Sequence, residues 1–547
     1  MKKINILSVL LTLSLASFSQ LNFSWAVQNG ASSGAEGKAL VTDPLGNSYV
    51  LGTVSGWPQS PISFGSNVLT KYGGQDILLV KFDAEGNYVW GKTFGNTGDD
   101  QGVDIAMDQE GNVVICGSYA GTVSFGSQSV TSVGSSSNVF VAKFDADGNN
   151  FWVFTTSGNG MKNVNSVAID ADNSIYLTGY YFNNATIFGF TPTEKGAYLV
   201  KLNQYGAFES IKTITSTGSF VNEGKDITIT NDGSILWTGN FNDTSNADGV
   251  SLTSLGQQDI FVFKYNSAGN YHWHQTFGGT AADSPTSITT DSDGKIYLTG
   301  GYRKVAGFGT ITLTAADEWY DDLFVAGLDN NGAVLWAKNS NTTYNNIYSI
   351  HAASDGLLYA GGKLANNTQI DGITHPGGMA LLAFNKSTGA LQSALSIEAI
   401  SFGTWADQIV GISTDVAGNL FVTGKFSGTK KFGETTLNQS NDGFFVAKLG
   451  NATAGTFVVK TGLNQFRAYP NPFNDKVQIK FQSHANTNAR IDIYDATGRK
   501  LKTLLNQYVS ANQENEVEFI PEPGTSGLYL CKITLNDKVY HVKLIRH

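Results

Sequence analysis

One pentapeptide near the N-terminus has the spacing of a serine nucleophile. The stretch "GASSG" at 30–34 matches G-x-S-x-G, with Ser32 at its centre. In that motif a strand leads into the serine and a helix follows, because the sharp turn between them exposes the hydroxyl. Here a polar turn leads into a second strand-like segment. The sequence therefore predicts no catalysis by Ser32, and we expect a non-enzymatic protein.

Two kinds of segment carry side chains that could bind metal ions. The turns "DADGNN" at 145–150 and "DSDG" at 291–294 begin like a calcium loop, and "HWH" at 272–274 places two imidazoles on one strand face. A calcium loop needs more oxygen ligands and a distal Glu, and a zinc site needs further ligands. We therefore predict hairpin turns, a solvated strand and no cofactor. Calcium binding at the Asp turns is the alternative.

Three segments carry aromatic residues that depart from the pattern of their surroundings. "ADEWYDDLF" at 316–324 places two aromatic rings among four acids, and "SFGTWADQ" and "SGWPQSP" each hold a Trp in a connection. Exposed aromatic rings stack on sugars or anchor a protein partner. The predicted ligand-binding residues are Trp319, Tyr320, Asp321, Asp322, Trp405 and Trp57. Local packing of each loop is the alternative.

The elements around these residues are copies of one unit. A Gly that ends an apolar strand recurs at intervals of 60 to 65 residues, at Gly52, Gly117, Gly179, Gly239, Gly300, Gly361 and Gly424. Each copy holds four short segments rich in Val, Ile, Phe and Tyr, separated by turns of Asp, Asn and Gly. Four strands in each of seven units predict an all-β fold, a seven-bladed β-propeller, with a β-solenoid as the alternative.

Tryptophan marks the fourth strand of most copies. The positions are Trp90, Trp152, Trp273 and Trp336. The third and sixth copies have Ser210 and Ser393 there instead. The seventh copy stops at Gly450 without a fourth strand, whereas a spare strand that contains Trp25 precedes the first copy. We predict that this N-terminal strand completes the seventh blade and closes the ring.

The repeated phrases also resemble a known family. "NVFVAKFDADGNNFW" at 138–152 and "DIFVFKYNSAGNYHW" at 259–273 are similar to the bacterial β-propeller repeats called SBBP, over residues 22–450. The resemblance implies the propeller fold. It implies no particular activity, because members of that family rarely share one.

The C-terminal segment has a different pattern and a closer resemblance. "AYPNPF", "IYDATGRKL", "GLYLCKI" and the terminal "KLIRH" predict a small β-sandwich and are similar to the type A sorting domain of the type IX secretion system. The resemblance implies transport across the outer membrane of a Gram-negative cell, with the secretion machinery as partner. The sorting-signal residues that it implies are Tyr469, Pro470, Asn471, Pro472, Gly498, Gly527, Tyr529 and Lys543.

The N-terminus reads as the start of the same export route. Lys2 and Lys3 precede an apolar run, and small residues follow before Gln20, which predicts a signal peptide at 1–19. We expect the propeller at 20–455, the sorting domain at 456–547, and no transmembrane segment in the mature chain. Cys116 and Cys531 lie in different predicted domains, so we predict no disulfide.

Charge separates the two predicted parts. The whole chain of 547 residues carries a net charge of −10, and 12 Lys and Arg against 8 Asp and Glu lie from Thr456 onward. The predicted propeller is therefore strongly acidic, which disfavours nucleic acid and anionic lipid as partners. We predict a secreted or surface-attached binding or adhesion protein with a glycan or surface-protein ligand. A carbohydrate-active lyase or hydrolase, and a structural subunit of a surface complex, are the alternatives.

Overall fold

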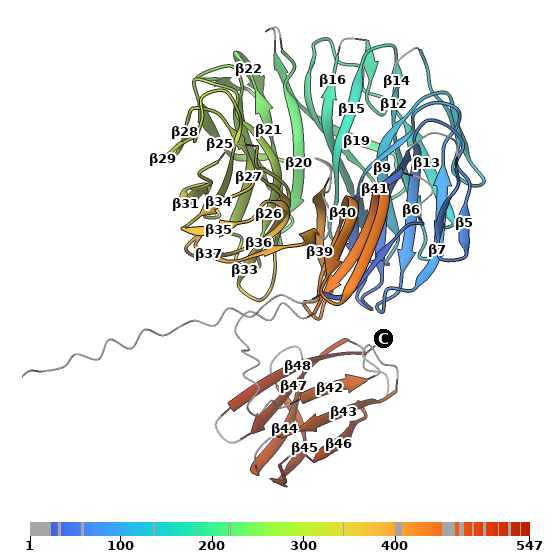
Figure 1. Cartoon of the computed structure of the whole chain (residues 1–547), viewed down its shortest axis with the longest axis vertical. Coiled ribbons are helices and arrows are strands. Elements are labelled where there is room, and N and C mark those ends of the chain that lie inside the picture. Colours follow the sequence, from blue (N-terminus) through green and yellow to red (C-terminus); the bar gives the residue numbers. More distant parts are fainter. Residues whose placement is uncertain are drawn as a thin grey trace, which may run out of the picture. The chain divides into compact units, whose positions relative to one another are not determined.

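The structure is a computed structural model, and the chain in it divides into two compact units, Met1–Ala454 and Gly455–His547 (Figure 1). It describes residues 23–30, 34–55, 60–134, 137–182, 184–216, 218, 220–342, 344–399, 407–450, 465–469, 475–483, 486–495, 499–511, 513–522, 527–535 and 538–546. Within these residues all regular structure is β-strand, so the predicted all-β class is confirmed. None of them forms a helix with the length and apolar character that crossing a membrane requires.

Each repeat of the first unit has four strands that pair in order in one antiparallel sheet, and we number these sheets 1 to 7 in chain order. Sheet 1 contains β2 (Gly34–Thr42), β3 (Ser48–Ser55), β6 (Asp76–Phe82) and β7 (Tyr88–Phe94). Sheet 2 contains β8 (Gln101–Met107), β9 (Val113–Tyr119), β12 (Asn138–Phe144) and β13 (Asn150–Thr155). Sheet 3 contains β15 (Lys162–Ile169), β16 (Ile175–Tyr181), β18 (Gly196–Leu202) and β19 (Phe208–Ser216).

The remaining sheets follow the same order, except that the last takes its fourth strand from the N-terminus. Sheet 4 contains β20 (Glu223–Ile229), β21 (Ile235–Phe241), β24 (Asp259–Tyr265) and β25 (Tyr271–Gly279). Sheet 5 contains β26 (Ser284–Thr290), β27 (Ile296–Tyr302), β30 (Asp322–Leu328) and β31 (Val334–Asn339). Sheet 6 contains β32 (Asn346–Ala352), β33 (Leu357–Leu364), β36 (Gly378–Asn385) and β37 (Leu391–Ser396). Sheet 7 contains β39 (Gln408–Thr414), β40 (Leu420–Phe432), β41 (Thr435–Leu449) and β1 (Phe23–Gln28).

Asp side chains build the turns between strands. In the turn between β6 and β7, Asp83 Oδ1 accepts the backbone N–H groups of Glu85 and Asn87 at 3.0 and 2.8 Å. Asp145 repeats this arrangement between β12 and β13, with Asp147 and Asn149 as the donors. The turns that begin like a calcium loop therefore use their first carboxylate to hold the hairpin, as predicted for turn residues of this kind.

The repeats also contain small peripheral hairpins, and in three of them the turn contains a Phe-Gly pair: Phe64-Gly65, Phe125-Gly126 and Phe308-Gly309. The hairpins with the pair are β4 (Ile62–Phe64) with β5 (Asn67–Leu69), β10 (Thr122–Ser124) with β11 (Ser129–Thr131), and β28 (Val305–Phe308) with β29 (Ile311–Thr314). Two hairpins lack it: β22 (Thr244–Ala247) with β23 (Val250–Thr253), and β34 (Thr368–Ile370) with β35 (Ile373–His375). The remaining short strands are β14 (Ser157–Gly158), β17 (Ala185–Thr186) and β38 (Glu398–Ala399). Sheets 3 and 4 extend further through the hairpins β22–β23 and β28–β29, and sheet 7 through β38. Phe64 and Phe308 are buried. Gly65 and Gly309 both have φ of +60°, a conformation that favours glycine, so each pair combines a core ring with a turn.

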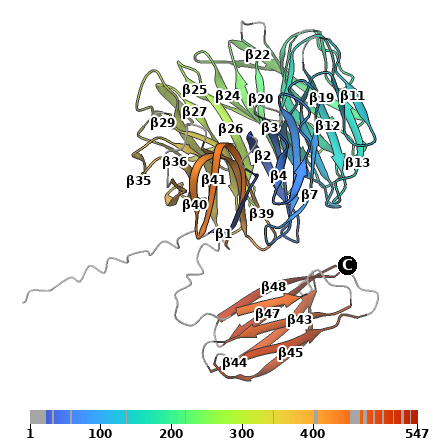
Figure 2. The ribbon, with the colours of Figure 1, turned by 45° about the vertical axis from the view of Figure 1, so that its right-hand side comes forward.

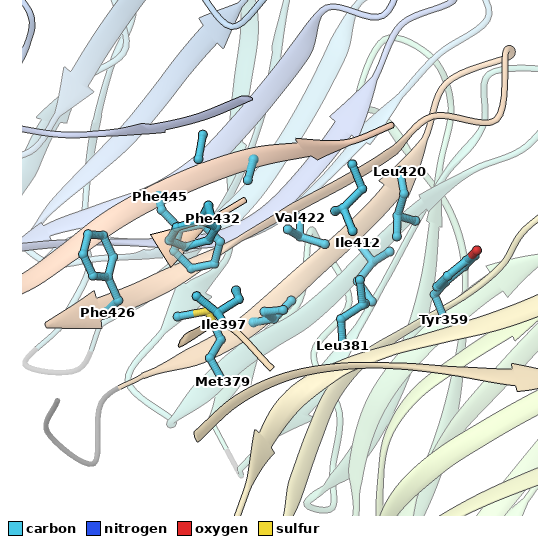
Figure 3. Packing of buried hydrophobic residues seen from close by; sticks show 14 of the residues in the cluster. Tyr359, Met379, Leu381, Ile397, Ile412, Leu420, Val422, Phe426, Phe432 and Phe445 are labelled. Atoms are coloured by element: carbon cyan, nitrogen blue, oxygen red, sulfur yellow. The ribbon is translucent and has the colours of Figure 1, made fainter. Parts of the chain in front are cut away.

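Neighbouring sheets pack face to face through apolar side chains. One such core lies between sheets 6 and 7, where Met379 and Leu381 meet Ile412, Val422 and Phe445 (Figure 3). The first strand of each sheet contacts the first strand of the next sheet, and β39 also contacts β2. Figure 2 shows these sheets side by side, with β1 beside β41.

The second unit consists of two antiparallel sheets. One contains β42 (Gln465–Tyr469), β43 (Val477–Gln482) and β46 (Glu514–Phe519), and the other contains β44 (Thr487–Asp495), β45 (Lys500–Val509), β47 (Gly527–Leu535) and β48 (Lys538–Arg546). Ile479 and Phe519 of the first sheet share one buried core with Ile491 and Ile533 of the second. The two sheets therefore form a sandwich.

Candidate functional site

Two exposed tyrosine rings meet at the end of sheet 5, and an exposed tryptophan precedes one of them in sequence. Trp319 and Tyr320 belong to the connection between β29 and β30, and 77% and 46% of their surfaces are exposed. Tyr344, 48% exposed, comes from the connection between β31 and β32. The ring centroids of Tyr320 and Tyr344 are 4.4 Å apart, at an interplanar angle of 37°. We call Trp319, Tyr320 and Tyr344 the aromatic platform.

Acidic residues hold the loop that carries the platform. Asp317 Oδ1 accepts the backbone N–H of Trp319 at 2.6 Å. Arg303, which follows β27, forms an ion pair with Asp321. Asp322 accepts the backbone N–H of Ala316 at 3.3 Å and the hydroxyl of Ser340. These contacts hold the loop at its start, middle and end. Because the loop is already ordered, ligand binding would lose less of its conformational entropy.

The polar groups of the platform suit a neutral, hydroxyl-rich ligand. The pKa of Tyr344 is raised to about 12, mainly by a hydrogen bond with Tyr320 and to a smaller extent by burial and the charge of Asp317. Its phenol is therefore protonated at neutral pH. Asp317 offers an acceptor beside the rings, while Arg303 balances the charge of Asp321. Flat rings with adjacent carboxylates can stack on the apolar face of a sugar and accept its hydroxyl protons.

The structure distinguishes among the residues predicted from the sequence. Trp319, Tyr320 and Asp321 lie together on the loop. Asp322 differs from the expectation, because it is fully buried and serves as a structural acceptor at the start of β30. Trp57 and Trp405 lie outside the described residues. Sequence reasoning missed Tyr344, which is distant in sequence from Trp319 and sits in an ordinary polar connection with no signal of its own.

A second polar feature lies where the first strands of all seven sheets meet. A cavity of about 200 Å³ is lined by residues of β2, β8, β15, β20, β26, β32 and β39, including Asp104 and Asp226. Burial, together with the nearby Asp226, raises the pKa of Asp104 to about 7. Burial also raises the pKa of Asp226.

Both of these carboxylates bind backbone groups of the next sheet. Asp104 Oδ2 accepts the N–H of Val167, and Asp226 Oδ2 accepts the N–H of Ile288, each at 2.8 Å. Ser166 adds its hydroxyl to Asp226 at 2.8 Å. The two acids therefore connect sheet 2 to sheet 3 and sheet 4 to sheet 5.

The other candidate motifs show no metal site or reactive thiol. His274 stacks on Phe263 and hydrogen-bonds to the Tyr271 hydroxyl at 2.9 Å. Cys116 and Cys531 are free and buried, and burial raises the pKa of both thiols. In the part of the chain that the structure describes, no three His, Cys, Asp or Glu side chains are grouped closely enough to hold a metal ion. Ser32 lies outside that part.

The sandwich of the second unit carries the remaining predicted residues. Tyr469 ends β42, Gly527 begins β47 and Lys543 lies in β48. Tyr529 is buried, and its ring meets that of Phe519 at 5.2 Å. Pro470, Asn471, Pro472 and Gly498 lie outside the described residues. The role of each of these residues in sorting stays a prediction.

Comparison with known families decides what this sandwich is. Residues 467–547 match the family described as "Secretion system C-terminal sorting domain". This region is a type IX secretion sorting domain. A sorting domain indicates export to the cell surface or the medium and implies contact with the secretion machinery.

Two curated proteins are similar to part of this chain. A WD repeat-containing protein of Acanthamoeba polyphaga mimivirus is 25% identical over 306 residues, and the regulatory protein FlaEY of Caulobacter vibrioides is 25% identical over 382 residues. These alignments cover 44% and 54% of this chain. The chain spans only 22% and 39% of the length of these relatives.

Solved structures show only weak likeness. A protein of unknown function from Dyadobacter fermentans is 8% identical with a TM-score of 0.37, and covers 79% of this chain and 99% of its own. An arabinoxylan arabinofuranohydrolase from Bacillus subtilis is 11% identical with a TM-score of 0.28, and covers 93% of this chain and 96% of its own. At these scores the likeness carries no argument about activity.

Proposed function

We propose that residues 20–455 form a closed, seven-bladed β-propeller of the SBBP type that binds glycans outside the cell and has no enzymatic activity. Sheets 1 to 7 would be the seven blades. The contacts between consecutive first strands, the contact of β39 with β2 and the pairing of β1 with β41 support a closed ring. A signal peptide at 1–19 and the sorting domain would together bring this propeller to the cell surface or the medium.

The aromatic platform is the observation that carries the binding function. The rings of Trp319, Tyr320 and Tyr344 expose apolar surface to water. A ligand that covers these rings would remove that surface from water, so such an exposed group favours binding. The acidic character of residues 20–455 favours neutral or cationic glycans over sulfated or carboxylated ones. A surface protein with its own sugar chains would present the same chemistry.

An enzyme built around the central cavity is the second candidate. The raised pKa values of Asp104 and Asp226 favour it, because perturbed carboxylates gather in active sites. Their bonds to Val167 and Ile288 favour the binding function instead, since carboxylate oxygens that accept backbone N–H groups have fewer lone pairs free for a substrate.

A glycan array tests the proposal. The purified mature chain should bind a set of neutral glycans, and Trp319→Ala and Tyr344→Ala should each weaken binding about ten-fold or more, because each removes a stacking face. Tyr205→Ala is the matched control: Tyr205 is 68% exposed on a turn of sheet 3 and should leave binding unchanged. Absence of any bound glycan, or equal binding by Trp319→Ala, would contradict the proposal. Release of shortened sugars that Asp104→Asn abolishes would support the enzyme instead.

A further inference from the structure

Four of the five fourth-strand tryptophans connect their blade to the hairpin turn of the next one. In these four the indole N–H donates to the carbonyl of the second turn residue, at 3.0 to 3.2 Å. The pairs are Trp25 with Ala84, Trp90 with Ala146, Trp273 with Asn330, and Trp336 with Lys386. The ring also lies against the turn glycine: a Cβ on Gly86 would meet Trp25 at 2.7 Å, and one on Gly332 would meet Trp273 at 3.0 Å. In blade 2, by contrast, Phe154 lies closer than Trp152 to the turn glycine Gly206 of blade 3.

Two blades lack this tryptophan, for different reasons. Blade 6 has Ser393, and its neighbour, blade 7, has no hairpin between the third and fourth strands, because β41 and β1 come from opposite ends of the propeller. An indole there would have no turn to meet. Blade 3 has Ser210, yet the turn at 266–269 in blade 4 is intact, with Asn266 Oδ1 accepting the N–H groups of Ala268 and Asn270. Among the described turns between third and fourth strands, only this turn in blade 4 has no aromatic ring of the preceding blade against its glycine, Gly269.

The space that the missing ring would fill is a pocket. It measures about 50 Å³ and is lined by Tyr176, Lys201, Ser210, Lys212, Tyr265 and Gly269, among others. On this measure one water needs about 10–15 Å³, so the pocket holds roughly four waters, close to the volume of one aromatic ring. Tyr176 and Tyr265 are buried walls, whereas Ser210 is exposed at the entrance.

The polar groups around the pocket lack the hydrogen-bond donor that a tryptophan supplies to the turn carbonyl in other blades. In blades 1 and 7, Lys81 and Lys448 donate to the same turn carbonyl as the tryptophan, at 3.1 and 3.2 Å. The corresponding Lys201 forms an ion pair with Glu209 at 3.2 Å instead. Among the described residues, no side chain donates to the Ser267 carbonyl, which stands where the indole acceptor stands in four other blades.

We propose that the pocket between blades 3 and 4 binds an indole ring, whose N–H donates to the Ser267 carbonyl. The ring would come from a free indole compound or from a Trp side chain of another polypeptide, since both present the same chemistry. The walls would hold it as the neighbouring blades hold their own tryptophans. This site is separate from the aromatic platform and does not depend on glycan binding.

Binding of 5-fluoroindole to the full chain, followed by ¹⁹F NMR, tests the site. We expect saturable binding that unlabelled indole displaces. Ser210→Trp supplies the ring from the chain itself and should weaken binding at least ten-fold, while Ser210→Ala leaves the pocket open and should bind as well as the wild type. Ser210→Leu fills the pocket with a smaller side chain and replaces Ser210→Trp if that variant does not fold.

The ligand source is resolved by a second probe. Binding of N-acetyltryptophanamide as well as 5-fluoroindole would support a pocket open to a Trp side chain, and binding of 5-fluoroindole alone would support a free small molecule. The proposal is overturned if the wild type shows no saturable binding, or if folded Ser210→Trp or Ser210→Leu binds 5-fluoroindole as tightly as Ser210→Ala.

Discussion

Buried carboxylates recur where one sheet meets the next. Asp100 accepts the N–H of Ala120 at 3.0 Å, and Asp283 accepts the N–H of Arg303 at 3.1 Å, so each ties the start of a first strand to the end of the second. Burial is the main cause that raises the pKa of Asp100 to about 6 and that of Asp283 to about 7. The charges of Asp76 and Asp259 beside them act in the same direction.

These groups predict a pH dependence of stability. In the unfolded chain their pKa is near 3.8, and in the folded chain it is higher, so the folded state holds more protons between about pH 4 and pH 7. The contribution of these two carboxylates to the free energy of unfolding should therefore fall as pH rises through that window. Burial lowers the pKa of His351 to about 4, so the contribution of that group rises with pH instead. For the two carboxylates we expect roughly 1–3 kcal/mol more stabilisation at about pH 5 than at about pH 7.5, measured by urea denaturation of the wild type against carboxylate variants.

The variant Asp283→Asn checks the cause. It removes one titrating group, so its stability should change less between the two pH values than that of the wild type. Asp147→Asn alters an exposed turn and should keep the wild-type slope. A slope that Asp283→Asn leaves unchanged would rule out this carboxylate as a source of the effect.

At the scale of elements, β1 has the partner that is most distant in sequence among the described strands. It pairs with β41 in the register Trp25 to Lys448 and Val27 to Val446. Beyond the strand, Asn29 Oδ1 accepts the N–H of Phe444 at 2.8 Å. A chain whose mature part begins after Asn29 would leave the edge of β41 unpaired and the seventh sheet one strand short.

We expect that truncation to lower the melting temperature by roughly 10 °C or more and to promote aggregation, because the ring would lose its closure. Differential scanning calorimetry with light scattering measures both. Trp25→Phe keeps the strand but loses the hydrogen bond to Ala84 and part of the ring contact with Gly86, so it should cost about 1 kcal/mol or more. An unchanged melting temperature in the truncated chain would argue against closure by β1.

Elements were easier to predict from the sequence than their contacts. Turn residues such as Asp83 and Asp145 bind their own backbone, so local chemistry placed most strands and hairpins. The small hairpins at the Phe-Gly pairs could not be predicted, because a three-residue strand has too little periodicity to be recognised. The proximity of Tyr344 to Tyr320, and the burial of Asp322, depend on how two connections fold over sheet 5, and no local pattern records that.

At the scale of the whole molecule, the chain combines a repetitive unit with a sorting domain of another pattern. Repetition explains why residues with a chemical role are few: a residue type that recurs in most repeats, such as the turn Asp, stabilises the fold. The places that differ are the platform around Trp319 and the pocket beside Ser210. The sorting domain gives these sites an extracellular setting.

Export by the sorting domain is the claim on which this setting rests. The measurement is the distribution of the first unit among periplasm, cell surface and medium, in a host with a type IX system, for the full chain and for a chain that ends before residue 467. The account predicts that the full chain reaches the surface or the medium and that the shortened chain stays in the periplasm. Equal amounts of both chains outside the cell would contradict it.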